Sequence, residues 1–474
     1  MERNPVMAEE WWLRAAKQGH GFAQMNLGML YSRGALGKKD PAKAYQWAKL
    51  SLTRGNRRAK QLVETLEREL NPEQIAEANA FVKVYKPMRE KAELAGGAPA
   101  STALAGIGLA LPEPMKNRRN GKARVGSMVA AGGQQQTYDA ILRGLEWLKA
   151  NQDGDGSWGA NDKRLGQPFS TDKNAMTGMA LPCFLGHGQT QDSPEYGATV
   201  RKAIEFLIST PPEDPGITQG NRGAYSHPIR TYALCEAYAM TKQRKLEPFA
   251  KKATEAIIKG QHESGGWAYG YRKGPTAHVD LSVTGWNVQA LKAATLTGIR
   301  LDGIDEAMDK AIAYVKRCQD STGKFAYKEG SSGKPSLTGA GVLCLQLWKN
   351  AKSHEAQKGL EWIVNNQTGE WPKVNLYEWY YHAQACFQAN GVNGWKKYWK
   401  AWNDNFQEIL LKAQADDGHW PQGAHFHGDT DIYRTTMTIL MLEVYYRYLP
   451  FVIVDPTSSQ LQLPGSREGS SQKK

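Results

Sequence analysis

Residues 144–159, "GLEWLKANQDGDGSWG", join the end of an amphipathic segment to a glycine-rich turn that closes on Trp158. Oxygen-bearing side chains around one glycine approach the pattern of a calcium loop: Asn151, Asp153, Asp155, Gly156 and Asp162. Such a loop needs hard oxygen ligands and a sharp turn. A polar run containing Pro168 follows, where the second helix of a calcium hand would begin. This departure favours a structural turn over a metal loop.

The same pattern returns four times along the chain. The copies are "AIIKGQHESGGWAYG" (256–270), "AYVKRCQDSTGKFAY" (313–327), "GLEWIVNNQTGEWP" (359–372) and "ILLKAQADDGHWPQG" (409–423). Each copy keeps a glutamine, a glycine and an aromatic residue, whereas the acidic residues are scattered. A degenerate copy within residues 203–228 brings the number of units to six. The repeated feature is therefore the turn, and not a set of calcium ligands.

A second helical segment follows each turn, and most begin with Thr and a small residue. The segments are "MTGMAL", "RTYALC", "VTGWNVQAL", "LTGAGVLCL", "YEWYYHAQA" and "RTTMTIL". Six alternating helix pairs, one row amphipathic and the other rich in small apolar residues, predict an all-α fold that closes into an α/α toroid, a six-fold double ring. The glutamine is expected to cap an adjacent helix end while the aromatic ring covers the turn.

A different repeat occupies the N-terminal region. Within residues 8–62 Trp12 returns as Trp47 and Ala23 as Ala59, at a period near 36. The stretch "AEEWWLRAAKQGHGFAQMNLGMLYSRG" resembles the Sel-one-like repeat, a helical solenoid unit that implies a protein-binding surface. We predict four regions: Sel-one-like repeats at 1–88, a flexible basic linker at 89–134, the toroid at 135–452 and a disordered tail at 453–474.

Composition narrows the class of protein further. The 474 residues carry a net charge of +13, and residues 1–134 hold 22 Lys and Arg against 12 Asp and Glu. Most of the net positive charge therefore lies in the repeats and the linker. This distribution does not favour a specific nucleic-acid site, but it is compatible with contact to an acidic surface or a membrane surface. The five cysteines lack metal or disulfide spacing, and we expect buried thiols. No apolar run is long enough to span a membrane.

The N-terminus "MERNPVMAEEWW" has no apolar signal-peptide core, so the sequence as written predicts a cytoplasmic protein. It begins inside a repeat, however. A truncated gene start would hide further repeats and make a periplasmic or exported location the expectation instead.

The glutamine-to-tryptophan repeats resemble the terpenoid cyclase and protein prenyltransferase superfamily over about residues 136–450, in particular bacterial squalene-cyclase-like proteins. Class II cyclases of that family protonate an alkene with an Asp-x-Asp-Asp-Thr box. In "DLSVT" Asp280 keeps the first position, but Ser282 stands at the proton donor and Val283 at the last acid. In "DTDIYRT" Asp431 follows another acid, with the threonine spaced differently. The resemblance thus implies the fold without the complete acid motif.

Protein prenyltransferases of the same superfamily hold zinc with an Asp-x-Cys pair and a later histidine. Asp280 matches the aspartate, but Ser282 occupies the cysteine position and His382 lies farther along than the family pattern requires. The complement-type Cys-Gly-Glu-Gln thioester is absent as well. We therefore predict neither a metal site nor another cofactor.

In such a toroid the N-termini of the inner helices open at one end of a central cavity. The side chains expected there are Asp280, Asp431 and His227 as catalytic candidates and Asp172, Tyr225, Trp286, Tyr381 and Tyr433 as ligand contacts. Aromatic rings with few acids suit an apolar isoprenoid or terpenoid ligand. Two alternatives stay open: a carbohydrate-active barrel that uses two carboxylates, and a non-catalytic protein-interaction scaffold.

Overall fold

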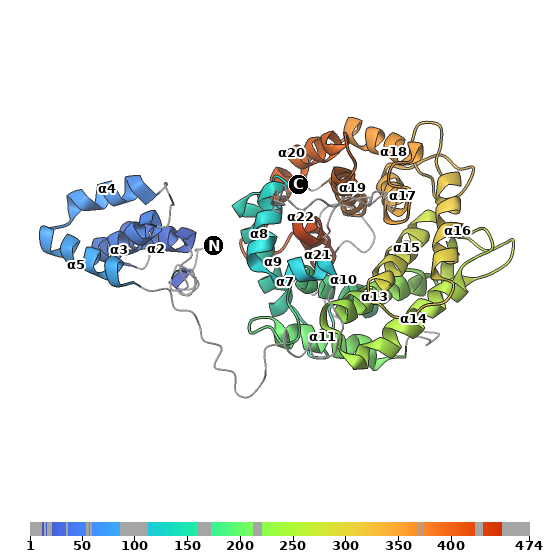
Figure 1. Ribbon diagram of the computed structural model, residues 1–474, viewed down its shortest axis with the longest axis horizontal. Helices are drawn as coiled ribbons and strands as arrows, with labels where there is room; N and C mark the ends of the chain where they lie inside the picture. Colours follow the sequence, from blue (N-terminus) through green and yellow to red (C-terminus); the bar gives the residue numbers. More distant parts are fainter. Residues whose placement is uncertain are drawn as a thin grey trace, which may run out of the picture. The chain divides into compact units, whose positions relative to one another are not determined.

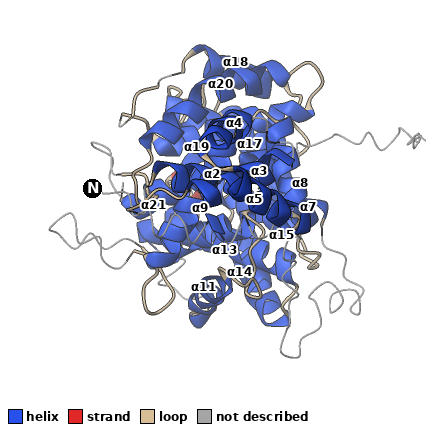
Figure 2. Cartoon of the chain, turned by 90° about the vertical axis from the view of Figure 1, so that its left-hand side faces the viewer, coloured by secondary structure: helices blue, strands red, loops and turns tan. Residues whose placement is uncertain are grey.

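The computed structural model describes residues 12–13, 16, 21–34, 37–53, 56, 59–85, 112–159, 172–211, 220–367, 369–371, 373–421 and 430–447. The chain divides into two compact units, Met1–Pro99 and Ala100–Lys474. Most of the described secondary structure is helical (Figure 2). One antiparallel pair of short strands, β1 (Trp267–Ala268) and β2 (Val279–Asp280), interrupts the helices. None of the described helices is both long and apolar enough to cross a bilayer.

The N-terminal unit contains α2 (Gly21–Arg33), α3 (Pro41–Thr53), α4 (Ala59–Glu69) and α5 (Pro72–Val84). Helix α3 packs against each of the other three. A Cβ added to Gly28 would lie 3.2 Å from the Ala48 Cβ, so the glycine lets α2 and α3 approach closely. The Trp47 ring makes edge contacts with Phe81 and Tyr85 of the last helix and its end. Small residues and one large aromatic ring therefore build this helical core.

The second unit is a double ring of helices (Figure 1). The outer helices in its described part are α9 (Gln135–Ala150), α11 (Gly197–Ser209), α14 (Glu247–Gly260), α16 (Ile304–Arg317), α18 (His354–Asn365) and α20 (Lys396–Ala413). The inner helices are α10 (Lys173–Gly186), α13 (Gly220–Thr241), α15 (Leu281–Thr295), α17 (Pro335–Leu347), α19 (Leu376–Gln388) and α21 (Asp431–Leu442). Short 3-10 segments follow α13, β1 and α19, respectively: η2 (Arg244–Leu246), η3 (Tyr269–Tyr271) and η4 (Ala389–Gly391).

Both rings close. Each inner helix contacts its neighbours along the chain, and α21 returns to contact α10, while α20 contacts α9. The inner helices are buried nearly all round; in α17 every residue from Leu337 to Leu347 is buried. The outer helices bury one face only, as in α16, where Ala307, Met308, Ala311, Ile312 and Val315 are among the buried residues. This difference confirms the predicted all-α toroid.

The repeated glutamine fastens five of the six described outer helices to the next one. The Gln152 side chain donates to Gly156 O in its own turn at 2.9 Å and to Thr199 O of α11 at 3.0 Å. The same bridge to the following outer helix recurs at Gln261, Gln319, Gln367 and Gln414. In the degenerate unit Arg230 of the inner helix α13 donates to Leu207 O of α11 at 2.9 Å, which joins the two helices of that unit. The glutamine thus stabilises the ring, because its side chain donates hydrogen bonds both to its own turn and to a neighbouring helix.

The glycine and the threonine of the repeat have separate structural tasks. Gly156, Gly265, Gly323 and Gly418 have φ between 88° and 101°, and a Cβ there would lie 2.3–2.9 Å from a carbonyl oxygen of the next outer helix. The aromatic backbone N–H donates to the inner-helix threonine, as from Trp158 to Thr177 at 3.2 Å and from Trp267 to Thr284 at 3.1 Å. Each repeat residue is therefore required by the geometry of the turn.

The predicted flexible linker differs from the structure at residues 113–130. Helices α7 (Glu113–Arg119) and α8 (Gly121–Ala130) pack against each other and against α22 (Val444–Arg447), which follows the last inner helix. Arg118 falls within the predicted flexible basic linker, but it is buried and binds Glu236 of α13 with a 3.0 Å ion pair. The pattern gave no sign of this partner, which lies far away in sequence. Residues 89–111 and 453–474 lie outside the described residues.

Candidate functional site

Asp280 forms the centre of the candidate site. It ends strand β2 and caps α15, with its Oδ1 atom accepting hydrogen bonds from Val283 N at 2.9 Å and Ser282 Oγ at 2.6 Å. The residue is fully buried, and its Oδ2 atom makes no hydrogen bond in the described structure. The His278 ring lies 3.6 Å from Oδ2 and is largely exposed. One carboxylate oxygen therefore supports the helix while the other remains available as an acceptor.

A chain of hydroxyl groups extends from Asp280 to the neighbouring inner helix. The Ser282 hydroxyl lies 2.7 Å from the Tyr225 hydroxyl of α13, which lies 3.1 Å from the Tyr269 hydroxyl of η3. Burial raises the pKa of Tyr225, and the Asp280 carboxylate raises it further. Burial and the neighbouring Tyr225 likewise raise the pKa of Tyr269. Both tyrosines consequently stay protonated and act as hydrogen-bonding groups.

Aromatic side chains of α19 cover the inner side of α15 beside this chain. Trp286 stacks on Tyr380 with ring centroids 5.7 Å apart and makes an edge contact with Tyr381 at 6.0 Å. Tyr377 packs against Tyr381 at 4.9 Å. The Tyr381 hydroxyl accepts a 3.0 Å hydrogen bond from Gln289. These rings give α15 an aromatic neighbour along two turns.

Three of the expected ligand contacts reach this cluster in different ways. Trp286 and Tyr381 are buried within it, whereas Tyr433 of α21 is half-buried. Burial raises the pKa of Tyr377, and the nearby Tyr225, Asp280 and Tyr433 raise it further. Residues from α13, α15, α19 and α21 thus converge at the N-terminal ends of the inner helices. The segments that precede α10, α13 and α21, residues 160–171, 212–219 and 422–429, lie outside the described residues.

His227 belongs to a separate polar cluster. Its Nδ1 atom lies 2.7 Å from the Tyr271 hydroxyl, which donates to Asn287 Oδ1 at 3.1 Å. Burial, with a smaller contribution from Arg230, lowers the pKa of His227 to about 3. Tyr271 holds a positive φ of 54° and packs over Gly260 of the outer helix α14. His227 therefore connects α13 with η3 and α15, and no described contact joins it to Asp280.

Asp431 and Asp172 also lie apart from Asp280. Asp431 is buried at the first turn of α21, with Oδ2 3.7 Å from His419 Nε2, and the His419 ring stacks on Trp147 of the outer helix α9. Thr430, and not Asp431, caps this helix. Asp172 caps α10 by accepting hydrogen bonds from Asn174 N and Ala175 N. Three acids expected at one mouth thus enter three different sets of contacts.

The histidine considered for a zinc triad is also separate from Asp280. His382 Nε2 lies 3.3 Å from Pro335 O, and its ring packs edge-on against Trp402 of the outer helix α20. Burial lowers its pKa to about 3. Among the described residues no group of three or more His, Cys, Asp or Glu is arranged to hold a metal.

Sequence reasoning missed Tyr269, Tyr377 and His419. Tyr377 precedes Tyr381 by one helical turn, so the inner-facing period of α19 was the signal that could have identified it. Tyr269 follows the aromatic residue of its turn by two positions. His419 immediately precedes Trp420 in the last copy of the turn. The repeat pattern gives no reason to expect that this residue contacts α21.

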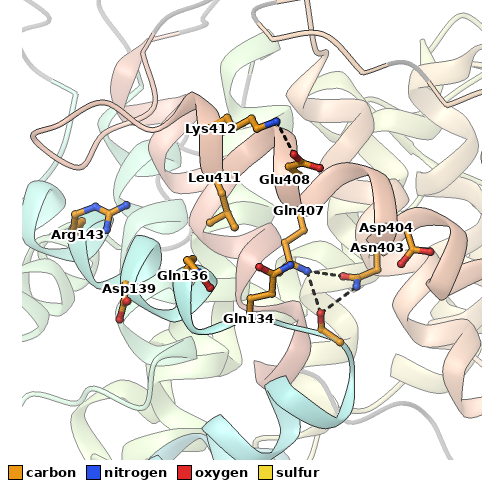
Figure 3. Close-up of a pocket in the computed structure, with 11 residues that line it drawn as sticks. Gln134, Gln136, Asp139, Arg143, Asn403, Asp404, Gln407, Glu408, Leu411 and Lys412 are labelled. Carbon is orange, nitrogen blue, oxygen red and sulfur yellow. Dashed lines mark hydrogen bonds and ion pairs between the residues drawn. The ribbon is translucent and has the colours of Figure 1, made fainter. Parts of the chain in front are cut away.

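A polar cleft of about 610 Å³ lies at the seam of the outer ring, between α9 and α20. Figure 3 shows its lining, which includes Gln134, Asp139 and Arg143 from the first outer helix and Asn403, Gln407 and Glu408 from the last. Gln407 donates to Asn403 Oδ1 and to Gly132 O at 3.2 Å each. The cleft is on the outer ring, and its amide groups are used to hold the seam together.

Comparison with known proteins agrees with this architecture. Residues 143–397 match the family described as the prenyltransferase alpha-alpha toroid domain, and residues 1–20 and 21–56 match the Sel1 repeat. The squalene–hopene cyclase of Zymomonas mobilis subsp. mobilis is 24% identical over 339 residues, which cover 62% of this chain and 49% of that protein. The chain therefore spans about half the length of this relative.

Two solved structures match the chain at low identity. An inactive variant of the α-1,6-mannanase GH76A of Salegentibacter sp. HEL1_6, in complex with α-1,6-mannotetrose, is 11% identical with a TM-score of 0.50, covering 66% of this chain and 99% of that one. The type II terpene cyclase MstE from Scytonema, in complex with geranylgeranyl dihydroxybenzoate, is 13% identical with a TM-score of 0.45, covering 66% and 97%. The matched toroid segment makes up more than half of the chain, and the protein therefore belongs to the prenyltransferase α/α toroid family, with Sel1 repeats at its N-terminus.

Proposed function

We propose that the toroid binds an apolar isoprenoid chain inside the inner ring, beside Asp280. The observation that carries this proposal is the convergence of Tyr225, Trp286, Tyr377 and Tyr381 from three inner helices on a single buried carboxylate. Aromatic rings offer apolar surface and π faces that attract partial positive charge, and both properties suit an unsaturated hydrocarbon chain. The relationship to a squalene–hopene cyclase supports the same ligand class.

The proposal is for binding, and not for cyclisation started by protonation. The position of the family's proton donor is Ser282, whose hydroxyl donates to Asp280 Oδ1 at 2.6 Å. An alcohol is far too weak an acid to protonate an alkene. Asp280 in turn accepts two hydrogen bonds through Oδ1, which makes it a hydrogen-bond acceptor at the helix end. The residues present therefore favour holding a ligand over initiating a carbocation.

A carbohydrate-hydrolysing role has less support. Glycoside hydrolysis requires two carboxyl groups on either side of one bond. Asp280 contacts Ser282 and faces Tyr225, while Asp431 pairs with His419 next to an outer helix. The two carboxyl groups expected to cooperate thus belong to separate clusters.

The Sel1 repeats support a protein partner for the N-terminal unit, because such helical solenoids provide extended binding surfaces. Contact of the basic N-terminal region with a membrane surface stays a prediction.

Direct lipid titration of the full-length protein tests the ligand class. Trp286 lies inside the cluster, so saturating geranylgeraniol or squalene should quench part of the tryptophan fluorescence. Trp286→Phe should remove that part of the signal, whereas Trp348→Phe, at the opposite end of inner helix α17, should leave it unchanged. The absence of saturable binding of either lipid would overturn the proposal.

A further inference from the structure

Side chains of α15 and α19 meet in the inner ring, although α17 lies between these two helices. The Trp286 ring stacks on Tyr380 with centroids 5.7 Å apart, and it makes an edge contact with Tyr381 at 6.0 Å. Gln289 donates to the Tyr381 hydroxyl at 3.0 Å and accepts from the Tyr380 hydroxyl at 3.2 Å. These four residues, the cross-ring bridge, therefore join two helices that are not neighbours in the ring.

The bridge lies on the side of both helices that is turned toward the ring axis. On α15, Thr284 faces outward, because it accepts a hydrogen bond from Trp267 N of the outer turn. Trp286 follows it by two residues, which is about 200° around the helix. On α19, the His382 ring packs against the outer helix α20, and Tyr380 precedes it by the same two residues. Trp286 and Tyr380 thus meet inside the ring.

The exposure of side chains changes between the N-terminal end of the inner ring and the bridge. Tyr225, Tyr377 and Tyr433, towards that end, are half-buried. Trp286 is only 3% exposed and Tyr380 is 0% exposed. The accessible surface therefore ends between these three tyrosines and the cross-ring bridge.

Helix α22 crosses the opposite end of the inner ring. It packs against α19 and α21. Its Arg447 donates to the Tyr232 hydroxyl of α13 at 2.8 Å, and the Tyr446 hydroxyl lies 3.1 Å from Nδ1 of His187, directly after α10. Because α13 and α19 stand on opposite sides of the ring, α22 spans this end. A ligand of the inner ring therefore enters at the end where Asp280 lies.

The depth available to such a ligand follows from the helix rise. Asp280 caps α15, and Trp286 is six residues farther along the chain. At 1.5 Å per residue this spacing corresponds to a depth of about 9 Å. An extended chain of two isoprene units has about this length.

We propose that the inner ring encloses about two isoprene units of its ligand, that the cross-ring bridge sets this limit, and that the rest of a longer chain stays outside. This inference rests on the proposed function, and it adds the length of the bound part. Trp286 and Tyr380 determine the limit, because their stacked rings occupy the space that a third unit would need.

A series of prenyl alcohols measures this limit on the full-length protein. Prenol, geraniol, farnesol and geranylgeraniol contain one, two, three and four isoprene units, and calorimetric titration below the solubility limit of each gives its affinity. Burial of a second unit should raise the affinity about tenfold or more from prenol to geraniol. From geraniol to geranylgeraniol the affinity should stay within about threefold, since the added units are not buried.

Substitutions in the stacked pair test whether the bridge sets the limit. In Trp286→Ala and in Tyr380→Ala, farnesol should bind about tenfold tighter than geraniol, because space for a third unit opens. Tyr380→Phe keeps the ring and loses only the bond to Gln289, so it should keep the wild-type pattern. Trp348→Ala, at the far end of α17, is a second control. The two affinities are compared within each variant, so a general loss of stability does not change their ratio.

The outcomes distinguish this inference from the function on which it rests. An affinity that rises steadily from prenol to geranylgeraniol in the wild-type protein overturns the inference and leaves isoprenoid binding intact. Wild-type ratios in both Trp286→Ala and Tyr380→Ala also overturn it. Failure of all four alcohols to bind the wild-type protein overturns the proposed function itself.

Discussion

The Gln414 side chain donates a 2.8 Å hydrogen bond to Ala140 O, a residue 274 positions earlier in the chain. The same amide donates to Gly418 O in its own turn at 2.8 Å. Four other copies of this glutamine join consecutive outer helices. Gln414 differs because it joins the last outer helix to the first. A local repeat motif therefore also closes the outer ring.

We expect Gln414→Ala to lower the free energy of unfolding by about 1–3 kcal/mol, since it leaves carbonyl groups on both sides of the seam without their donor. Urea unfolding followed by circular dichroism measures this change. Gln135→Ala removes a local, exposed bond to Asp139 and serves as the control. Equal changes in unfolding free energy for the two substitutions would show that the bond between the last and first outer helices contributes no more stability than a local surface bond.

Gly418 allows the last turn to approach the first outer helix. It has a φ of 101°, and an added Cβ would lie 2.4 Å from Arg143 O, while Gly298 has a φ of 75° with open space around it. Each Gly→Ala substitution should lower the free energy of unfolding by about 1 kcal/mol, because alanine disfavours the left-handed backbone conformation. Gly418→Ala should cost about 1–3 kcal/mol more because of the clash. Thermal unfolding of the pair measures the difference, and equal melting temperatures would argue against this close approach.

Arg118 anchors helix α7 to the toroid through Glu236 and Arg447. It donates to Glu236 at 3.0 Å and to Arg447 O at 2.9 Å. Burial alone would raise the pKa of Glu236, but Arg118 and Arg447 outweigh it and hold this pKa below its usual value. Arg118→Met should therefore destabilise the protein by about 3–5 kcal/mol, because it removes one partner of a buried ion pair.

Urea unfolding of Arg118→Met and of Arg118→Met with Glu236→Gln tests this anchor. The double variant should be little less stable than Arg118→Met alone, because Glu236 has then already lost its Arg118 partner and keeps only Arg447 at 3.3 Å. An Arg118→Met variant as stable as the wild type would indicate that α7 does not depend on the buried pair.

His227 should make the stability of the protein pH-dependent. Burial, with a smaller effect of Arg230, lowers its pKa to about 3, against roughly 6.5 in an unfolded chain. Below about pH 6.5 the unfolded chain binds a proton at this histidine, whereas the folded chain does not. The free energy of unfolding therefore decreases as the pH falls towards 3. His227→Asn keeps a donor for Tyr271 but does not titrate, and the pH slope of the unfolding free energy should become shallower. His354→Asn, at an exposed position, should leave the slope unchanged; identical slopes for all three proteins would contradict the prediction.

The fold was predictable because its repeat residues are required by local geometry. The glutamine, the glycine and the threonine each have one fixed contact in the turn, so their spacing survives in the sequence. The helices α7 and α8 were not predictable in this way. Arg118 lies in a basic, glycine-flanked segment, and its burial depends on Glu236, which only the folded chain brings close.

The candidate site was predictable in part for the same reason. Asp280 stands at a helix start next to a repeat threonine, which drew attention to it. Its connection to Tyr225 through Ser282 and its approach to Tyr377 depend on side-chain directions across three helices. Asp431 begins α21 and His227 lies two turns inside α13, yet the side chains of both enter other clusters. A position near a helix start thus predicts at which end of the ring a residue lies, but not which side chains it contacts.

Photoaffinity labelling tests the central claim most directly. A geranylgeraniol carrying a diazirine on its chain is added to the full-length protein, irradiated and mapped by peptide mass spectrometry. Binding inside the inner ring predicts labels on the peptides that contain Tyr225, Trp286 and Tyr377, and unlabelled geranylgeraniol should suppress them. Labels confined to the outer cleft between α9 and α20 or to the Sel1 repeats, or labels that excess ligand does not suppress, would contradict isoprenoid binding at this site.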